Sequence, residues 1–511
     1  MLKNALRHAI LLQKEGYIVF DEEIREFFNA FAVLLSIIHD NCIRGSDLVY
    51  DPRYKRFCSE YWEQLATRLS EGETELIKYL NELVVEISKA DESERACFAF
   101  AICMWLDSKI TYELDDYEGM ILVVLALAPD GFTVVNSLND NYEETKIWIN
   151  PKFQAHNSYD EETHETRSAA IGFSFTGING ALKNISYYRY DGTFRIRNVI
   201  LNEKDKSEYK NGFLNIAFAP MTDKSLLDLF DTKDVEVTFR GQNNKGWEIT
   251  FKNPSDFFLE RMVNDMKLAG MKNVNILLMP EMLGTSLSCD DGRGFIEWVR
   301  KAADNLLLEG YNVPDFIVLP SYWHNRTNTA TIVNGRGQVM AVQHKYEPFR
   351  DSKEMKIEAL AEQTVKEYTI IHMPGVHRVA VTICSDYLGD ANNKWSDILC
   401  QCLGVTLILI PSFSAGETAF NKTIARYIEY GTTGFWGNCC GAIISKAKEI
   451  GCCCIAEINA LDRFGDKCAC CNSCDGKTAC IFVEQIALDL PLAKGTNTNK
   501  KHKCQHYLKK E

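Results

Sequence analysis

Hydrophobic residues in the first hundred positions recur with the period of an α-helix. One such stripe runs through Phe27, Phe31, Leu34 and Ile38, and a similar one covers 76–87 after a break at Gly72. From about residue 116 the pattern changes to short runs typical of strands, among them 132–135, 146–149 and 185–200, the last with a turn at 190–192. We therefore predict a helical region over 1–115 and a β-rich region over 116–205, which either form one α+β domain or stand apart.

Beyond a charged linker at 201–210, β-like runs alternate with helical patterns. We expect strands at 213–218, 274–279, 316–319, 369–372, 379–383 and 407–410, helices from about 253, at 294–309 and at 396–404, and a hairpin at 330–344. The stretch 222–253 is interpreted as a polar insertion. Alternating strands and helices predict a sheet covered by helices, in which ligands gather at the carboxyl ends of the strands.

Composition narrows the classes of protein to which the chain can belong. A chain of 511 residues is too long for one core, and 46% hydrophobic with 25% charged residues is typical of globular domains. The net charge of −14 argues against a nucleic-acid partner, and the basic stretch 492–511 is interpreted as a solvated tail. The longest apolar runs are shorter than the roughly 20 residues that cross a bilayer. With 19 cysteines and no signal peptide pattern, we expect reduced thiols and a cytoplasmic location.

Three predicted strands each end in a residue with reactive chemistry. Glu281 follows a strand and a proline, Lys345 ends the second strand of the hairpin, and Cys384 ends the run 379–383 just before a turn. Taken singly, such residues are more often a loop start, a solvated lysine and a core thiol. Together they are a nucleophile, a base that can take its proton and a cation that can stabilise an anionic intermediate. The backbone amide of Ser385 begins the turn and can also face an oxyanion.

The motifs around these residues resemble those of the nitrilase, or carbon-nitrogen hydrolase, superfamily. The similarity covers about 211–491 and rests on Met279-Pro-Glu281, on His344-Lys345-Tyr346 and on Ile383-Cys384-Ser-Asp386. It implies an αββα sandwich preceded by the separate N-terminal α+β domain, a triad of Glu281, Lys345 and Cys384, and a thioester mechanism without metal or organic cofactor. It also implies a homo-oligomer and a second glutamate after the lysine, for which Glu354 is nearest and Glu347 and Glu358 are alternatives.

The resemblance predicts a hydrolase of a small molecule with a non-peptide carbon-nitrogen bond, an amide rather than a nitrile. After Asp386 the chain continues Tyr387-Leu-Gly-Asp390, where many relatives have Arg-Phe-Pro-Glu, so the substrate class is open. An alternative is a sensor or assembly module of a multi-component system, such as an antiviral defence system, in which hydrolysis is secondary. Residues 1–205 resemble no family, and they could recruit a protein partner.

Eleven cysteines are concentrated between Cys439 and Cys504. Within this group Cys468, Cys470, Cys471 and Cys474 have a spacing that could hold a structural zinc ion, which prefers four thiolate or imidazole ligands. Redox-sensitive thiols are another interpretation. Ordinary thiols on the last hairpin of the fold are favoured over both, with Cys468 and Cys470 on one face of the strand and Cys471 on the other.

Overall fold

The computed structural model comprises 511 residues, and the chain divides into two compact units. The first unit contains residues 1–194 and 397–404, and the second contains 195–396 and 405–511. The structure describes residues 22–40, 48, 50–110, 124, 128, 131–136, 143–151, 178–182, 184–190, 194–202, 209, 212–252, 257–284, 293–351, 355–374, 376–388, 398–414, 420, 423, 432–442, 450–456, 466–471, 478–487 and 505–508. Within these ranges no helix is both long enough and apolar enough to span a membrane.

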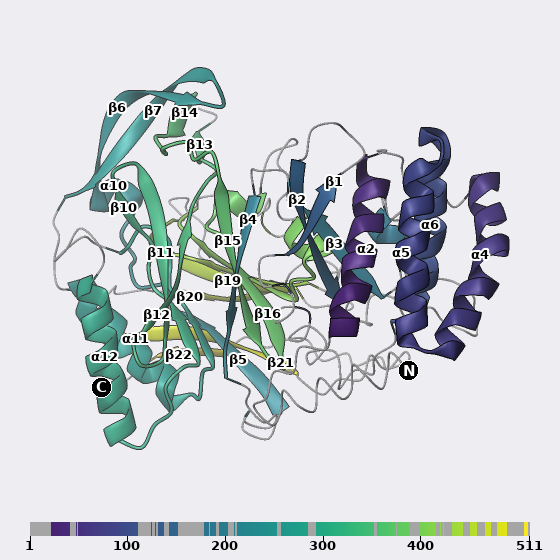
Figure 1. The fold of residues 1–511 in the computed structure, drawn as a ribbon. Helices are drawn as coiled ribbons and strands as arrows, with labels where there is room; N and C mark the ends of the chain where they lie inside the picture. The colour runs from purple at the N-terminus through teal and green to yellow at the C-terminus, as the bar shows by residue number, and fades with distance from the viewer. Residues whose placement is uncertain are drawn as a thin grey trace. The chain divides into compact units, whose positions relative to one another are not determined.

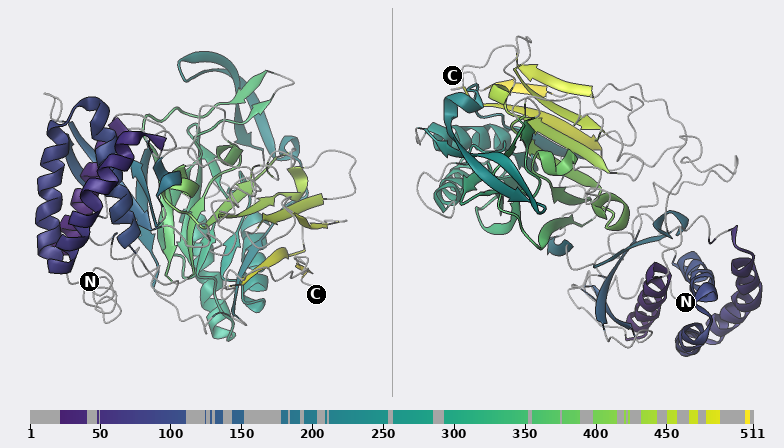
Figure 2. Two further views of the ribbon diagram at one scale, coloured as in Figure 1. Left: turned by 90° about the vertical axis from the view of Figure 1, so that its right-hand side faces the viewer. Right: turned by 90° about the horizontal axis from the view of Figure 1, so that it is seen from above.

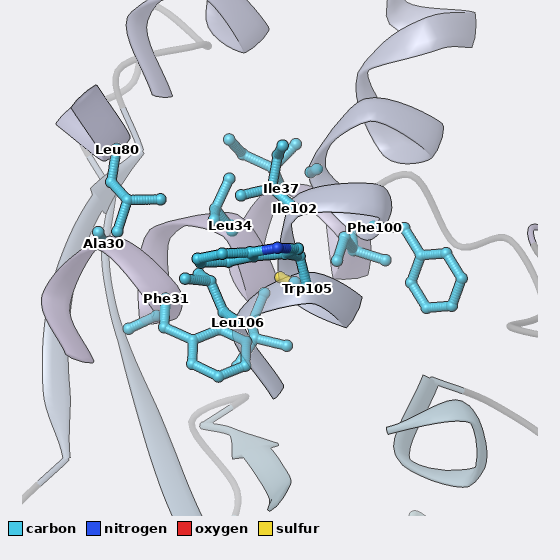
Figure 3. Packing of buried hydrophobic residues seen from close by; sticks show 14 of the residues in the cluster. Ala30, Phe31, Leu34, Ile37, Leu80, Phe100, Ile102, Trp105 and Leu106 are labelled. Atoms are coloured by element: carbon cyan, nitrogen blue, oxygen red, sulfur yellow. The ribbon is translucent and has the colours of Figure 1, made fainter. Parts of the chain in front are cut away.

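The first unit contains four long helices within the described residues, and the apolar stripes at 27–38 and 76–87 fall in the first and the third of them. They are α2 (Glu22–Asp40), α4 (Pro52–Glu71), α5 (Glu73–Lys89) and α6 (Glu92–Lys109). Asp51 caps α4 by accepting a hydrogen bond from the backbone nitrogen of Arg53 at 2.8 Å, and Pro52 takes the first helical position. Trp105 of α6 is 3% exposed among aliphatic side chains of α2 and α6, which form the core of the unit (Figure 3).

A small antiparallel sheet completes the first unit. Its strands are β1 (Phe132–Asn136), β2 (Glu143–Pro151) and β3 (Ile185–Arg189), in that order, and α2 packs against β1 and β2 (Figure 1). The short helix α9 (Ile178–Ala181) precedes β3. The buried carboxylate of Asp107, at the end of α6, accepts hydrogen bonds from the backbone nitrogens of Asn184 and Ile185, both at 2.9 Å. Helices and sheet therefore share one apolar core and are also joined by polar contacts.

A short piece of the chain from far along the sequence belongs to this first unit. Residues 398–402 form a single π-helical turn, η5 (Ile398–Cys402), at the place where a helix over 396–404 is expected. The carbonyl of Cys402 accepts hydrogen bonds from Ser186 Oγ at 2.9 Å and from Asn150 Nδ2 at 3.3 Å. Asn179 Nδ2 donates to the sulfur of Cys402. The first unit thus holds the segment that lies in the sequence between Cys384 and the next strand of the second unit.

The second unit contains an eight-stranded sheet with three parallel strands at its centre. Its path is β10 (Tyr322–His324), β11 (Thr327–Asn334), β9 (Phe316–Val318), β8 (Ile276–Leu278), β5 (Phe213–Phe218), β21 (Cys480–Ala487) and β22 (Gln505–Leu508), and β12 (Val339–His344) pairs with β11. Helices α11 (Phe257–Met271) and α12 (Arg293–Leu308) pack on one face, in a cluster that includes Ala217, Leu277 and Ile317. The hairpin β11–β12 forms where the sequence predicts it.

A seven-stranded sheet forms the other half of the sandwich. Its order is β20 (Asp466–Cys471), β19 (Ile450–Ala456), β18 (Thr433–Asn438), β17 (Leu407–Ser412), β16 (His377–Val381), β15 (Lys366–Met373) and β4 (Phe194–Ile200). A Cβ atom added to Gly437 of β18 would lie 2.1 Å from the ring of Phe218 in β5, so the two sheets pack face to face. The mixed α/β class and the separate N-terminal α+β unit agree with the sequence analysis. The β-like run 185–200 contains two strands that belong to different sheets, β3 and β4, and the expected turn lies mostly outside the described residues.

A long hairpin extends from the second unit at a place where the sequence suggested only a polar insertion. After the short helix α10 (Leu226–Leu229), strands β6 (Phe230–Phe239) and β7 (Gln242–Phe251) pair along their whole length and arch outward (Figures 1 and 2). They form a four-stranded sheet with β13 (Arg350–Asp351) and β14 (Lys356–Glu358), and β14 runs parallel to β7. Val235, Val237 and Phe239 alternate with polar residues, and this is the signal that predicts a strand here.

Candidate active site

The structure brings the ends of three strands of the second unit together. Glu281 lies three residues beyond β8, Lys345 directly follows β12, and Cys384 lies three residues beyond β16. The three residues are 1%, 3% and 3% exposed, respectively. Two sheets thus contribute to one buried polar cluster, with Glu281 and Lys345 from the eight-stranded sheet and Cys384 from the seven-stranded sheet. Buried charges are costly unless they are paired or serve a chemical purpose.

The carboxylate of Glu281 is held by three hydrogen bonds. Its Oε1 accepts from Lys345 Nζ at 2.7 Å and from Asn328 Nδ2 at 2.9 Å. Its Oε2 accepts from the backbone nitrogen of Phe413 at 3.1 Å, at the end of β17. The oxygen Oε2 therefore keeps more acceptor capacity than Oε1. Glu281 is also close enough to Cys384 to raise the pKa of its thiol.

Lys345 lies between two carboxylates. Its Nζ donates to Glu281 at 2.7 Å and to Glu358 Oε2 at 2.6 Å, and Glu358 also accepts from the backbone nitrogen of Phe349 at 2.9 Å. Burial opposes the charge of Lys345, but Glu281 and Glu358 outweigh that effect, so the pKa of Lys345 is raised well above its ordinary value. Burial raises the pKa of Glu358 as well, against the opposing effect of Lys345. The lysine is therefore a fixed ammonium ion.

Of the two candidates for the second glutamate that the structure describes, Glu358 is the one beside the lysine. Glu347 instead accepts hydrogen bonds from Arg240 and from Lys366, at 2.8 Å and 3.0 Å. Glu354, the nearest candidate by sequence, lies outside the described residues. Glu358 is the last residue of β14, whose pairing with β7 brings it back toward Lys345.

Cys384 lies at a sharp bend between β16 and the helical turn α13 (Ser385–Leu388). Its φ angle of 49° is in the left-handed region, which costs energy in a non-glycine residue, and its backbone nitrogen donates to the carbonyl of Pro411 at 3.0 Å. Burial and the nearby Glu281 raise the pKa of the thiol well above its ordinary value, while Lys345 acts in the opposite direction. The resting sulfur is therefore a thiol that needs a base. The amide of Ser385 begins the helical turn, where backbone N–H groups lack intrahelical acceptors.

Asp386 joins the bend at Cys384 to the chain after Lys345. Its Oδ1 accepts hydrogen bonds from the backbone nitrogens of Tyr346 and Glu347, at 2.9 Å and 2.7 Å. Ser385 Oγ donates to the carbonyl of Glu347 at 2.6 Å. Burial raises the pKa of Asp386 well above its ordinary value. In the sequence Asp386 is only part of a motif, whereas in the structure its carboxylate positions the backbone that follows Lys345.

The cysteine-rich hairpin lies at the edge of the seven-stranded sheet. Backbone pairing of β19 with β20 sets Cys452 opposite Cys470 and Ile450 opposite Cys471, with irregular register at two points. Cys468 is in the same strand, and Cys474 lies outside the described residues. Among the side chains that the structure describes, no group of three or more metal-ligating residues comes together.

The second unit contains a cavity of about 540 Å³, and one of its lining residues is Met282, which follows Glu281 in the chain. Three pieces of the second unit line it: Met282 and Gly284, the strand β7 with neighbouring Phe230, and the turn between β10 and β11. The backbone of this wall is fixed, because Met282 and Gly284 donate hydrogen bonds to the side chain and the carbonyl of Ser321, at 2.9 Å and 2.8 Å. The sequence does not predict this cavity, because the hairpin that forms one of its walls has the pattern of a polar insertion over 222–253.

Comparisons with known proteins gave matches only among solved structures. No family model and no curated protein matches the chain. One similar structure is a mutant of the amidase from Nesterenkonia sp. AN1 that shows Michael addition of acrylamide at the active-site cysteine, with 15% identity, a TM-score of 0.33, and coverage of 48% of this chain and 85% of the amidase. Another is a mutant of the same amidase in complex with butyramide, with 14% identity, a TM-score of 0.35, and coverage of 55% and 94%. A further structure of this amidase is described as belonging to the nitrilase superfamily, with 14% identity and a TM-score of 0.35.

Proposed function

We propose that the chain belongs to the nitrilase superfamily and that its second unit hydrolyses the carbon-nitrogen bond of an amide through a thioester on Cys384. The observation that carries the proposal is the buried hydrogen-bonded cluster of Glu281, Lys345 and Glu358 at the strand ends next to this thiol. The sequence motifs and the sandwich of two sheets support the family assignment.

In the first half of the reaction, Glu281 accepts the proton of the thiol while the sulfur of Cys384 attacks the amide carbon. The new C–S bond leaves a negative charge on the amide oxygen, which the ammonium of Lys345 and the amide of Ser385 stabilise. Glu281 then passes its proton to the nitrogen as the C–N bond breaks. Ammonia or an amine departs, and the acyl group remains on the sulfur as a thioester.

In the second half, Glu281 removes a proton from water, and the oxygen attacks the thioester carbon. Collapse of this second tetrahedral intermediate breaks the C–S bond, returns the proton to the sulfur and releases the acid. The raised pKa of Cys384 fits this scheme, because thiol deprotonation is coupled to attack and needs Glu281 as base. Glu358 acts through Lys345 by keeping it charged and oriented.

The test measures ammonia release from a panel of small primary amides and nitriles. We expect turnover of at least one amide by the wild type, and its loss by a factor of at least about 10⁴ in Cys384→Ala, since nucleophile and base act as one unit. In parallel, an electrophilic amide should label Cys384, as read by mass spectrometry, while Cys439→Ala serves as the matched control for another buried thiol. Labelling of other cysteines with Cys384 unmodified, together with no ammonia from any amide, would favour the sensor or assembly role instead.

A further inference from the structure

The cavity that Met282 helps to line has an apolar, partly aromatic part and a polar part, the latter formed by Thr250, His324, Asn325 and the ion pair of Glu248 with Arg326. Phe230 and Phe251 meet edge to face, with their ring centroids 4.9 Å apart, and Trp323 and Met282 contribute further apolar lining. Arg326 Nε donates to the carboxylate of Glu248, so the lining charges offset each other. The aromatic part suits a flat ring, and the polar part offers hydrogen-bonding groups to the rest of a ligand.

The wall formed by β7 is fixed at both ends of its hairpin. At the tip, Arg240 donates two hydrogen bonds of 2.8 Å to Glu347, and its backbone nitrogen donates to Glu362 at 3.1 Å. At the base, the backbone nitrogen of Lys252 donates to the carbonyl of Leu229 at 2.9 Å. The volume of the cavity is within the range of about 300–1,000 Å³ typical of small-molecule sites. The cavity is therefore built before any ligand arrives, which lowers the cost of binding.

The cavity shares its walls with the elements that carry the catalytic cluster. Met282 directly follows Glu281 in the chain. In the pairing of β7 with β14, Trp247 stands opposite Glu358, and the next two residues of β7 line the cavity. On the far side, the carbonyl of Arg326 accepts a hydrogen bond from the backbone nitrogen of Ala361 at 2.7 Å. A group bound in the cavity would thus lie against the segments that hold both glutamates.

We infer that this cavity binds an uncharged aromatic group of the substrate, so that the substrates are amides that carry an aryl substituent. This inference rests on the proposed function for its link to catalysis. The aromatic part of the lining supplies the recognition of the ring, and Glu248 and Arg326 bring charges of opposite sign to the same cavity.

The first experiment measures binding without turnover. In Cys384→Ala protein, isothermal titration calorimetry compares phenylacetamide with acetamide, and we expect the aryl amide to bind at least about tenfold more tightly. Trp323→Ala removes one wall, and Thr250→Trp fills the cavity from an exposed position of β7. Each added to Cys384→Ala should reduce the preference to within about threefold. Tyr311→Ala, at an exposed aromatic residue beyond α12, is the matched control and should leave the preference unchanged.

The second experiment measures the ratio of kcat/KM for the two amides in protein with Cys384 intact. An aryl preference that falls in both Trp323→Ala and Thr250→Trp supports the inference. Equal binding of the two amides to Cys384→Ala, or a preference that survives both substitutions, overturns it and leaves the hydrolase proposal to its own test. Conversely, Trp323-dependent aryl binding without turnover of any amide would support the cavity and contradict the hydrolase.

Discussion

At the scale of single residues, the most informative contact is the one between Lys345 and Glu358. Two carboxylates share one ammonium in a buried cluster, so removing either carboxylate changes both the charge and the orientation of the lysine. After burial, Glu281 is the main cause of the raised pKa of the Cys384 thiol, whereas Glu358 is connected to the proposed chemistry by its hydrogen bond with Lys345. The proposed mechanism therefore assigns Glu358 a positioning role.

This assignment predicts different results for two nearby glutamates. We expect Glu358→Gln to lower kcat for amide hydrolysis by about 100-fold with a smaller change in KM, because Lys345 loses one of the partners that keep it charged and oriented. Glu354→Gln, the matched control, should stay within about twofold. Steady-state ammonia release measures both, and thermal unfolding shows whether each variant is folded. If Glu354→Gln lowers kcat more than Glu358→Gln does, Glu354 is the second glutamate instead.

For Asp386 we predict that a substitution changes the stability of the fold rather than the proposed chemistry. Asp386→Ala leaves two buried backbone N–H groups without their acceptor, and we expect it to lower the free energy of unfolding by about 3 kcal/mol. Asp386→Asn keeps an acceptor oxygen at the same place, so its cost at neutral pH should be below about 1 kcal/mol. Urea denaturation followed by circular dichroism measures both free energies. A similar loss in the two variants would contradict the role of the oxygen as an acceptor.

The raised pKa of Asp386 also predicts the direction in which the stability of the fold changes with pH. Because the pKa of Asp386 is raised in the folded chain, the folded state holds a proton that the unfolded state has already released. Its contribution to stability is present below the ordinary pKa of about 4 and is lost as pH rises through the folded value. The stability of the wild type should therefore decline as pH rises through this range, and Asp386→Asn should not show this decline. The measurement is the difference between the unfolding free energies of wild type and variant at a series of pH values.

Which residues of the site the sequence could predict depends on how local their placement is. Glu281, Lys345 and Cys384 each follow an apolar strand within a few residues, so local patterns are enough to propose them. Glu358 is different, because its place beside Lys345 arises from the pairing of β14 with a strand more than a hundred positions earlier in the chain, as in Ile357 opposite Gly246. The number of positions between Lys345 and a glutamate does not show which glutamate strand pairing brings close to the lysine.

At the scale of elements, close contact between the two sheets depends on glycine. The missing side chain of Gly437 lets the ring of Phe218 approach β18, and any added methyl group would meet that ring. Alternation along β5 explains the arrangement: Ala217 packs with the helices, and Phe218 points to the other sheet.

We expect Gly437→Ala to destabilise the protein by about 2 kcal/mol through overpacking. Phe218→Leu should be destabilising alone but should recover part of the loss when combined with Gly437→Ala. A double-mutant cycle of unfolding free energies measures this coupling, which should exceed about 0.5 kcal/mol. Additive effects of the two substitutions would show that the sheets do not meet at this point.

Elements whose partners lie next to them in the sequence were predicted well, and others were not. The helical stripes of α2 and α5 and the hairpin β11–β12 carry their signal in local spacing. The strands β3 and β4 look like one hairpin in sequence, yet they join different sheets because pairing with β2 and with β15 competes with pairing to each other. Long-range pairing of this kind leaves no local pattern.

At the scale of the whole molecule, the chain crosses between its two units more than once. The segment 397–404 packs with the first unit, although the sequence on either side of it belongs to the second. The spacing of its apolar residues predicts a helical segment but contains no information on which unit it joins. Removing the first unit would therefore take away the packing partners of a segment that starts only about a dozen positions after Cys384.

We predict that a fragment comprising residues 194–511 unfolds at lower temperature than the full chain and hydrolyses amides more slowly. In the fragment, the carbonyl of Cys402 loses its hydrogen bonds from Ser186 and Asn150, and 397–404 should become the first site of limited proteolysis. Differential scanning calorimetry and mass spectrometry of the proteolytic products measure these effects.

A substitution in the full chain separates this cause from the general loss of a domain. Ser186→Ala with Asn150→Ala removes the two hydrogen bonds to Cys402 and should cost about 2 kcal/mol, with faster cleavage within 397–404. Ser108→Ala removes a hydrogen bond to the carbonyl of Trp105 elsewhere in the same unit and should leave cleavage there unchanged. If the fragment matches the full chain in stability and in protection of 397–404, the first unit does not hold this segment, and the second unit folds by itself.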